Sequence, residues 1–202
     1  MKQLSTEELV EGGYRVKRED THLMKDGKLD IETIEKHGTG GDGVSATYYY
    51  GFDLGGGQRL FVFGGHLSGY LKDISTWGSL YRRYYEYYPS GVLRKAGVTY
   101  RESVKLGTWY EYNEEGRVID IIDYDRPFKF TLNDVLDFMK RNNIKDEDLE
   151  HLARAVVKKN GKDQAYWEFE IKLERYMKRI YTLDGVTGDV VEVYERDDSP
   201  WL

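Results

Sequence analysis

The chain lacks cysteine and has no apolar run long enough to form a membrane-spanning helix. Without cysteine there is no disulfide and no thiol nucleophile, and the redox compartment stays open. Without a long apolar run we expect no insertion into a membrane. The first residues, MKQLSTEELVEGG, lack the apolar core of a signal peptide. We therefore expect a cytoplasmic protein, or a periplasmic or envelope protein if a signal peptide has been removed.

Basic side chains are outnumbered by acidic ones. The chain carries 36 acidic and 30 basic side chains, for a net charge of −6. Nucleic acids and anionic membrane surfaces select for basic patches, so we expect neither as a partner. An acidic surface suits a basic protein partner instead.

Motifs for catalysis and cofactor binding are missing as well. There is no Gly-x-Ser-x-Gly and no His-Glu-x-x-His, and His22, His37, His66 and His151 lie far apart in the sequence. The glycine-rich segment 38–43 lacks the Gly-Lys-Ser/Thr of a phosphate loop, and we interpret it as a flexible connection. We therefore predict no catalytic residue, no metal and no cofactor.

What the chain does have is tyrosine and glycine, with 18 and 22 residues, and much of the tyrosine falls in a repeated pattern. The stretches Tyr84–Tyr100 and Trp109–Asp125 each read as an aromatic run, a polar turn ending in glycine, and a second run rich in Val, Ile or Leu. Aromatic and β-branched residues suit a pleated strand, and glycine suits a tight reversal. The pattern predicts two β-hairpins that stack side by side.

Side-chain alternation places the repeated tyrosines on one face of this predicted sheet. Tyr85 and Tyr87 share a face of their strand, and Tyr110 and Tyr112 take the equivalent face of theirs. One interpretation is that these rings form the hydrophobic layer of the sheet. The other is that some of them form an exposed binding surface.

The repeated stretch resembles a known family. YYEYYPSGVL followed by GTWYEYNEEGRV is similar to the MORN-like repeats of the YwqK antitoxin family, over Trp77–Asp125. The resemblance implies a β-meander of hairpins. It also implies a protein that binds and neutralises a toxin.

Upstream of the repeats the elements are shorter. We predict strands at Tyr48–Tyr50 and Arg59–Phe63, joined by a glycine turn, and a strand at Ile31–Lys36. A capping box at the N-terminus predicts a short helix from about Thr6 to Glu11.

Downstream, the pattern changes to helices followed by strands. Thr131 caps a predicted helix, and a second helix is predicted over Asp146–Lys159 from the spacing of its apolar residues. Three strands follow, and the motifs WEFEIKL and IYTLDGVTGDVVEVYE resemble a PepSY-like domain. That resemblance again implies a binding or inhibitory module.

These elements predict an α+β protein with two domains. Residues 1–126 would form a β-rich antiparallel meander of MORN-like hairpins. Residues 127–202 would form a small C-terminal domain of two helices and three strands.

We expect the chain to be an immunity or antitoxin protein that occludes a basic toxin. In this hypothesis aromatic anchors give affinity, while acidic side chains give orientation and rapid association. A structural or envelope-associated repeat module is the first alternative. A hydrolase that uses the carboxylates between Asp120 and Asp125 is the second, although such carboxylates also occur on solvated strand edges. The expected partner-binding residues are Tyr84, Tyr88, Trp109, Glu111, Glu114, Glu115, Asp120, Asp123 and Asp125.

Overall fold

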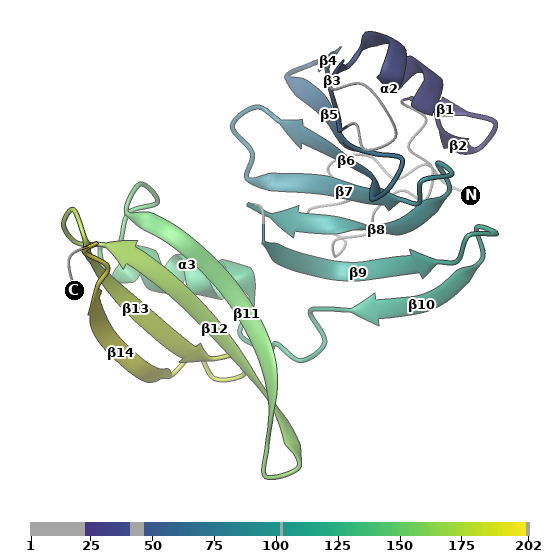
Figure 1. The fold of residues 1–202 in the computed structure, drawn as a ribbon. Helices are drawn as coiled ribbons and strands as arrows, with labels where there is room; N and C mark the ends of the chain where they lie inside the picture. The colour runs from purple at the N-terminus through teal and green to yellow at the C-terminus, as the bar shows by residue number, and fades with distance from the viewer. Residues whose placement is uncertain (1–22, 41–46, 102, 201–202) are drawn as a thin grey trace. The chain divides into compact units, whose positions relative to one another are not determined.

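The computed structural model describes residues 23–40, 47–101 and 103–200. It divides the chain into two compact units, residues 1–124 (unit 1) and residues 125–202 (unit 2), as Figure 1 shows. The division falls after Tyr124, whereas the sequence placed the boundary after Arg126. The short helix expected from about Thr6 to Glu11 lies outside the described residues.

Unit 1 is built on an eight-stranded antiparallel sheet in which every strand pairs with its neighbours in the sequence. The strands are β3 (Thr39–Gly40), β4 (Tyr48–Gly55), β5 (Gln58–Gly65), β6 (Gly69–Thr76), β7 (Tyr81–Tyr87), β8 (Leu93–Tyr100), β9 (Val104–Tyr112) and β10 (Val118–Asp123). A small hairpin of β1 (Met24–Lys25) and β2 (Lys28–Leu29) precedes the helix α2 (Ile31–His37). The predicted strands at Tyr48–Tyr50 and Arg59–Phe63 and both repeated hairpins are confirmed.

The core of unit 1 lies on the sheet face that α2 and β2 contact. Leu29 and Ile34 belong to the same buried cluster as the sheet residues Leu60, Val62, Tyr70, Ile74, Tyr85, Tyr87, Ala96, Val98 and Tyr112. Tyr110 packs against this cluster and is half-buried. The repeated tyrosines therefore form the hydrophobic layer of the sheet, and they are not exposed as a binding surface.

The strand expected at Ile31–Lys36 is wrong, because this segment is the helix α2. Asp30 precedes it, and its carboxylate accepts a hydrogen bond from the Thr33 amide at 3.1 Å. This side chain provides an acceptor for one of the amides that have no hydrogen-bond partner in the first turn of a helix. Ile34 is then fully buried in the core cluster, and the half-buried Ile31 packs against the same cluster, so these two residues hold α2 against the sheet.

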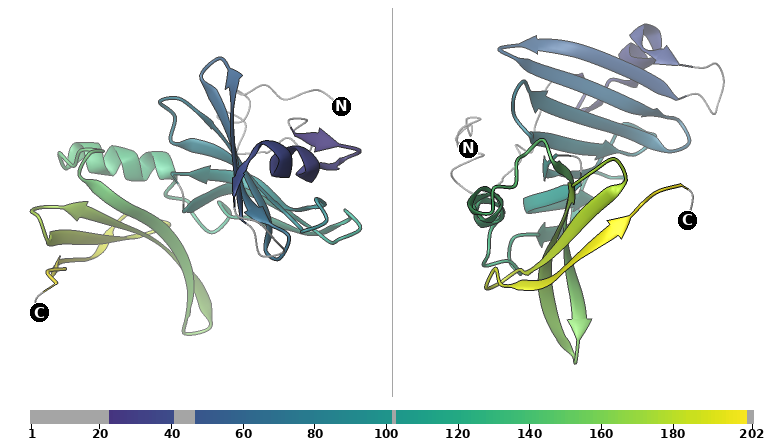
Figure 2. Two further views of the ribbon diagram at one scale, coloured as in Figure 1. Left: turned by 45° about the horizontal axis from the view of Figure 1, so that its top comes forward. Right: turned by 90° about the vertical axis from the view of Figure 1, so that its left-hand side faces the viewer.

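Unit 2 consists of one helix and a four-stranded antiparallel sheet, and Figure 2 shows the helix lying along one face of that sheet. The elements are α3 (Leu132–Arg141), β11 (Leu149–Lys159), β12 (Lys162–Lys172), β13 (Met177–Asp184) and β14 (Val190–Asp197). Thr131 caps α3 through a capping box with Asp134. Phe138 of α3 makes edge-on contacts with Phe169 and Tyr181, at centroid distances of 6.1 and 6.2 Å.

The predicted fold class, α+β with two helices and three strands at the C-terminus, is wrong. Strands take 57% of the described residues and helices 10%, and the strands form three antiparallel sheets. The segment expected as a second helix, Asp146–Lys159, contains the strand β11. Unit 2 is therefore a four-stranded sheet with a single helix.

The turn after β11 explains this difference. Asn160 and Gly161 have positive φ angles of 52° and 76°. Two consecutive positive φ angles are the conformation of the two-residue turn that joins antiparallel strands. Asn-Gly therefore closes a hairpin between Lys159 and Lys162, directly after the segment that was predicted as a helix.

No helix in the described part of the chain is both long and apolar enough to cross a membrane.

Candidate binding surface

The hairpin of β9 and β10 ends the eight-stranded sheet and carries most of the expected partner-binding residues. Its turn is held by Asn113, whose amide donates to the Arg117 carbonyl at 3.0 Å and whose side-chain oxygen accepts from the Arg117 amide at 2.9 Å. Gly116 supplies the positive φ of 75° that the reversal needs. This geometry leaves Glu114 and Glu115 exposed at the tip.

β10 is the last strand of the sheet, and no strand of the described residues pairs with its outer side. Apolar side chains stay exposed along it: Ile119 is 62% exposed and Ile121 is 60% exposed. The register with β9 shifts between Val118 and Asp120, which places a β-bulge at Ile119. The strand therefore presents apolar side chains to the solvent along an edge that no described strand pairs with.

The hydrogen bonds show which amides of β10 face this open edge. The Tyr124 amide donates to the Gly107 carbonyl of β9 at 2.9 Å, so it points inward. Because successive amides of a strand point to opposite sides, those of Ile121 and Asp123 point outward. The Ile121 amide donates to the Asp120 carboxylate at 2.8 Å, which agrees with this assignment.

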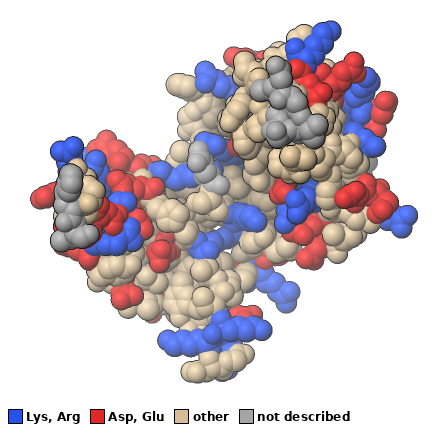
Figure 3. Space-filling model, viewed as in Figure 1, with Lys and Arg blue, Asp and Glu red and all other residues tan. Residues whose placement is uncertain are grey.

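The acidic residues of the hairpin differ in their surroundings. Glu114, Glu115, Asp120 and Asp123 are exposed. Glu111 is half-buried and lies 2.8 Å from the ammonium of Lys95 across the strands, and its hydrogen bond raises the pKa of that lysine. Figure 3 shows acidic side chains with a few basic ones among them over the end of the sheet where this turn lies.

The three aromatic residues expected at the surface are less accessible than the acids. Trp109 is only 2% exposed, and its indole donates a hydrogen bond to the Val98 carbonyl at 3.2 Å. It packs against the half-buried Tyr84, with ring centroids 5.4 Å apart, and burial raises the pKa of that tyrosine. Tyr88 is half-buried and donates to the Tyr112 carbonyl at 2.9 Å. Trp109 is therefore buried on a face of the sheet and is not part of an exposed surface.

Asp125 belongs to unit 2 and not to the hairpin. Its carboxylate lies 2.6 Å from the guanidinium of Arg154, whose side chain is 6% exposed. The same guanidinium lies over the rings of Phe128 and Trp167. Asp125 thus compensates the charge of a buried guanidinium, and this ion pair lies within unit 2.

An exposed aromatic cluster on β4 and β5 was not predicted as a site. Tyr49, Phe61 and Phe63 are 40–48% exposed, and the Tyr49 ring lies 5.1 Å from that of Phe63. A shallow hollow of about 250 Å³ begins at Phe63 and extends to Tyr84 and Glu86. Alternation could have revealed the cluster, because the buried Leu60 and Val62 alternate along the strand with the exposed Phe61 and Phe63.

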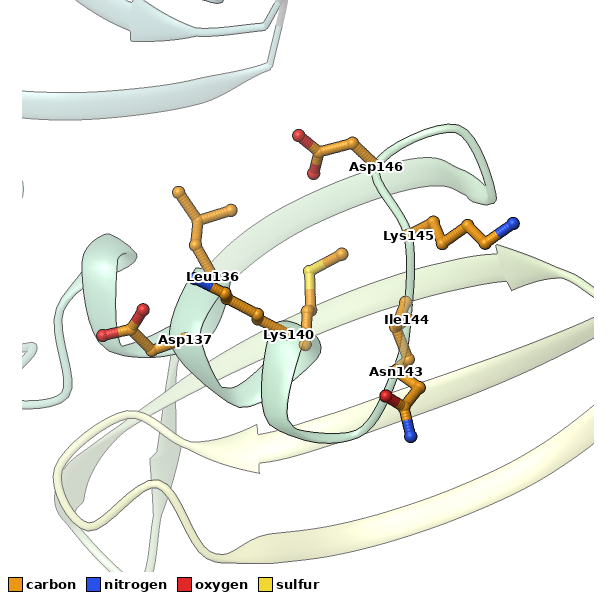
Figure 4. A pocket seen from close by; sticks show the side chains of 8 residues that line it. Leu136, Asp137, Lys140, Asn143, Ile144, Lys145 and Asp146 are labelled. Atoms are coloured by element: carbon orange, nitrogen blue, oxygen red, sulfur yellow. The ribbon is translucent and has the colours of Figure 1, made fainter.

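A second hollow, of about 520 Å³, lies at the C-terminal end of α3. Figure 4 shows that Asn143, Lys145 and Asp146 point in different directions around it and do not converge on a common point. Its charged lining residues, Asp137, Lys140, Lys145 and Asp146, balance in sign. This arrangement gives no set of groups aimed at a ligand.

The histidines do not assemble a metal site in the part of the chain that the structure describes. The imidazole of His66 lies 2.6 Å from the carboxylate of Glu35, and His151 is exposed on β11. No group of three or more His, Cys, Asp or Glu residues that could hold a metal ion occurs among the described residues. His22 lies outside them.

Comparison of the chain with family models, curated proteins and solved structures gives no match. The resemblances to the YwqK family and to PepSY-like domains therefore rest on the quoted motifs alone.

Proposed function

We propose that the chain is a non-enzymatic protein-binding module that captures a basic partner through its β9–β10 hairpin. In its most concrete form it is an immunity or antitoxin protein that occludes a cognate toxin. The observation that carries this proposal is the combination of exposed acids and exposed isoleucines on one edge strand and its turn. Glu114 and Glu115 lie at the tip of the turn, and Asp120 and Asp123 lie on the same strand as Ile119 and Ile121.

The two kinds of side chain have different roles in the proposed mechanism. Exposed acids attract a basic surface over a distance of about 10 Å at moderate salt, and so they raise the association rate. Exposed isoleucines contribute affinity when they are buried in the complex, at roughly 25 cal/mol for each Å² of apolar surface removed from water. Binding at this edge would cover the basic cleft of a toxin without any chemical step. The MORN-like motifs support the antitoxin assignment.

The proposal is tested by measuring association with the product of the adjacent gene. The partner is co-expressed and purified with the chain, and association rates are then measured at several salt concentrations. Reversing charge at the turn, with Glu114→Lys and Glu115→Lys together, should slow association roughly tenfold at low salt and less at high salt. Glu111 is left unchanged because it pairs with Lys95.

The matched control reverses two exposed acids in unit 2, Glu168→Lys and Glu174→Lys. It changes the net charge equally and should keep most of the wild-type rate. If both double variants associate equally slowly, then net charge acts without regard to position, and the hairpin is not the binding site. Failure of the wild type to capture a basic partner would contradict the proposal and favour the structural, envelope-associated alternative.

A further inference from the structure

The hairpin of β11 and β12 projects beyond the rest of its sheet, as Figures 1 and 2 show. Strand β12 pairs with β13 only from Tyr166 onward, whereas its pairing with β11 continues to the turn at Asn160 and Gly161. No other described strand pairs with residues 155–164, which we call the arm, and all of these residues are exposed. Because a hairpin of two strands adds little stability by itself, the packing of unit 2 does not account for the arm.

Basic side chains gather on the arm although the chain as a whole is acidic. The arm carries three lysines, Lys158, Lys159 and Lys162, and one acid, Asp163. Figure 3 shows basic side chains around the projecting end of the hairpin. Lys178 of the same unit lies within 4 Å of three carboxylates, whereas no ion pair of the described residues involves a lysine of the arm. The positive charge of the arm is therefore available to a ligand.

The register of the hairpin places two of these lysines side by side. Lys158 lies opposite Asp163 on one face of the arm, where the two charges have opposite signs. Lys159 lies opposite Lys162 on the other face. Like charges directly opposite each other destabilise a strand pair. An anionic group that binds both ammonium groups would remove this repulsion.

The face that carries the paired lysines continues with an apolar side chain. Val157 lies two residues before Lys159, so it shares this face, and it is 46% exposed. Val156 is 44% exposed on the opposite face. A ligand that fits the face of Val157 therefore offers negative charge at the tip of the arm and apolar surface behind it.

This order favours a protein segment over a nucleic acid or an anionic membrane. A phosphate backbone offers no apolar surface to Val157, and the exposed Glu168, on the same face of β12 as Lys162, repels an extended polyanion. A hairpin that enters a membrane buries apolar side chains deeper than charged ones. In the arm the lysines lie at the tip and the valine lies behind them, which is the reverse order.

We propose that the arm binds an acidic segment of a protein partner, with two carboxylates at Lys159 and Lys162 and an apolar side chain on Val157. This inference concerns unit 2 and goes beyond the proposed capture of a basic partner by the β9–β10 hairpin. It gives the chain a second binding surface, whose charge is opposite to that of the first. The two proposals are independent, because they use different residues in different units.

The test is a titration of synthetic peptides into the full chain labelled with nitrogen-15. One peptide carries Glu-Glu-Ile-Ile between flanking threonines. A second replaces the glutamates with glutamines, and a third replaces the isoleucines with threonines. The first should bind about tenfold more tightly than each of the others, because each of those lacks either the charge or the apolar surface. The amide shifts that it changes should belong to residues 155–164.

Two double variants test the role of the paired lysines. Lys159→Gln with Lys162→Gln should weaken the first peptide about tenfold. It should keep or raise the melting temperature, because it removes the repulsion between the two ammonium groups. The control, Lys129→Gln with Lys172→Gln, removes two exposed lysines outside the arm and should keep the wild-type affinity.

A matched pair of single variants tests which face is used. Val157→Thr keeps a β-branched side chain but removes apolar surface beside the paired lysines, so it should weaken the first peptide severalfold. Val156→Thr makes the same change on the opposite face and should leave the affinity unchanged. Equal effects of the two variants would contradict the assigned face.

The inference is overturned if the three peptides bind equally, if none of them binds, or if the shifts change outside the arm. A DNA duplex of random sequence and phosphatidylserine vesicles are titrated in parallel, and tighter binding of either would also overturn it. So would self-association of the chain that the Lys159 and Lys162 double variant abolishes, because the arm would then bind a second copy. Failure to capture a basic partner in the co-purification experiment would overturn the proposed function alone.

Discussion

A single glycine decides where Trp109 lies. Gly97 of β8 is buried, and a Cβ atom placed on it would overlap the two ring-fusion carbons and the nitrogen of the Trp109 indole. Gly97 is not among the residues with a positive φ, so its backbone does not require glycine. The missing side chain instead makes room for the indole on the sheet, beside Tyr84 and Tyr124.

Gly97→Ala should therefore destabilise unit 1 by about 1–3 kcal/mol, the usual cost of forcing extra atoms into a packed core. The measurement is the midpoint of unfolding in urea, monitored by tryptophan fluorescence. Gly51→Ala is the matched control, since Gly51 also lies in a strand of the same sheet and a Cβ on it meets nothing within 4 Å. Its midpoint should change by less than the equivalent of about 0.5 kcal/mol. Equal midpoints for the two variants would show that Trp109 does not depend on the space above Gly97.

The burial of Trp109 also shows how much of the candidate site the sequence could predict. Exposed acids at Glu114, Glu115 and Asp120 follow from their place at a turn and on an outer strand. The burial of Trp109 depends on which residue lies beside it on the neighbouring strand, and that requires the register between β8 and β9. The register contains a bulge between Ala96 and Val98, which hairpin spacing alone does not reveal.

At the scale of elements, the hairpins closed by glycine and the helix after Thr131 were predicted correctly, whereas the segments Ile31–Lys36 and Asp146–Lys159 were not. Gly91 and Gly116 both take the positive φ expected of them, at 77° and 75°. The apolar residues of β11 fit helical spacing, but Leu149 and Leu152 are also the positions that its sheet buries. Pairing of β11 with β12 along most of its length favours the strand over the helix. This partner strand is present only in the folded chain.

An ion-pair cluster joins all four strands of unit 2. Lys178 of β13 lies within 4 Å of carboxylates of Glu150, Glu170 and Asp198, and Arg196 of β14 contacts the last two. Arg196, with a smaller contribution from Lys178, lowers the pKa of Asp198 to about 2. Glu150, followed by Asp198, raises the pKa of Lys178 to about 12.

These shifts predict that the melting temperature falls at low pH. Asp198 has a lower pKa in the folded chain than the ordinary value of about 3.9, so its contribution is complete above about pH 4. That contribution is lost as the pH falls from about 4 toward 2, because the unfolded chain binds the proton first. Asp198→Asn should therefore lower the melting temperature at pH 6 and flatten its dependence between pH 4 and 2.

Salt and a second aspartate provide the controls for this prediction. The cluster is exposed, so added salt should reduce the difference between wild type and Asp198→Asn. Asp163→Asn changes an exposed aspartate near the tip of the β11–β12 hairpin and is compared in the same pH series. If Asp198→Asn has the same pH dependence of the melting temperature as the wild type, the cluster adds nothing to stability.

At the scale of the whole molecule, unit 2 contains everything that a separate domain needs. Its helix covers one face of its sheet, and Phe128 packs on Trp167 with ring centroids 5.1 Å apart. Asp125, which begins the unit, neutralises Arg154 within it. The core, the cap of the helix and the ion pairs thus all fall between residues 125 and 202.

Residues 125–202 expressed alone should therefore fold. The measurement is a proton–nitrogen NMR spectrum, in which dispersed amide signals are expected. A shorter piece that begins at residue 128 lacks Asp125, leaves the buried Arg154 without that carboxylate, and should melt at a lower temperature. Amide signals bunched at random-coil shifts in the longer piece would show that the two units need one another to fold.

The order of strands in unit 1 has a consequence for how the chain reaches its fold. From β3 to β10 each strand pairs with the strand before it, so nearly all the hydrogen-bonded contacts of the sheet are local in sequence. Closing each hairpin costs little chain entropy, because the loops between strands are short. Proteins with such local contacts fold faster than sheets that join distant segments. During synthesis, each new strand can pair with the strand synthesised just before it, and β10 is the last strand to join the sheet.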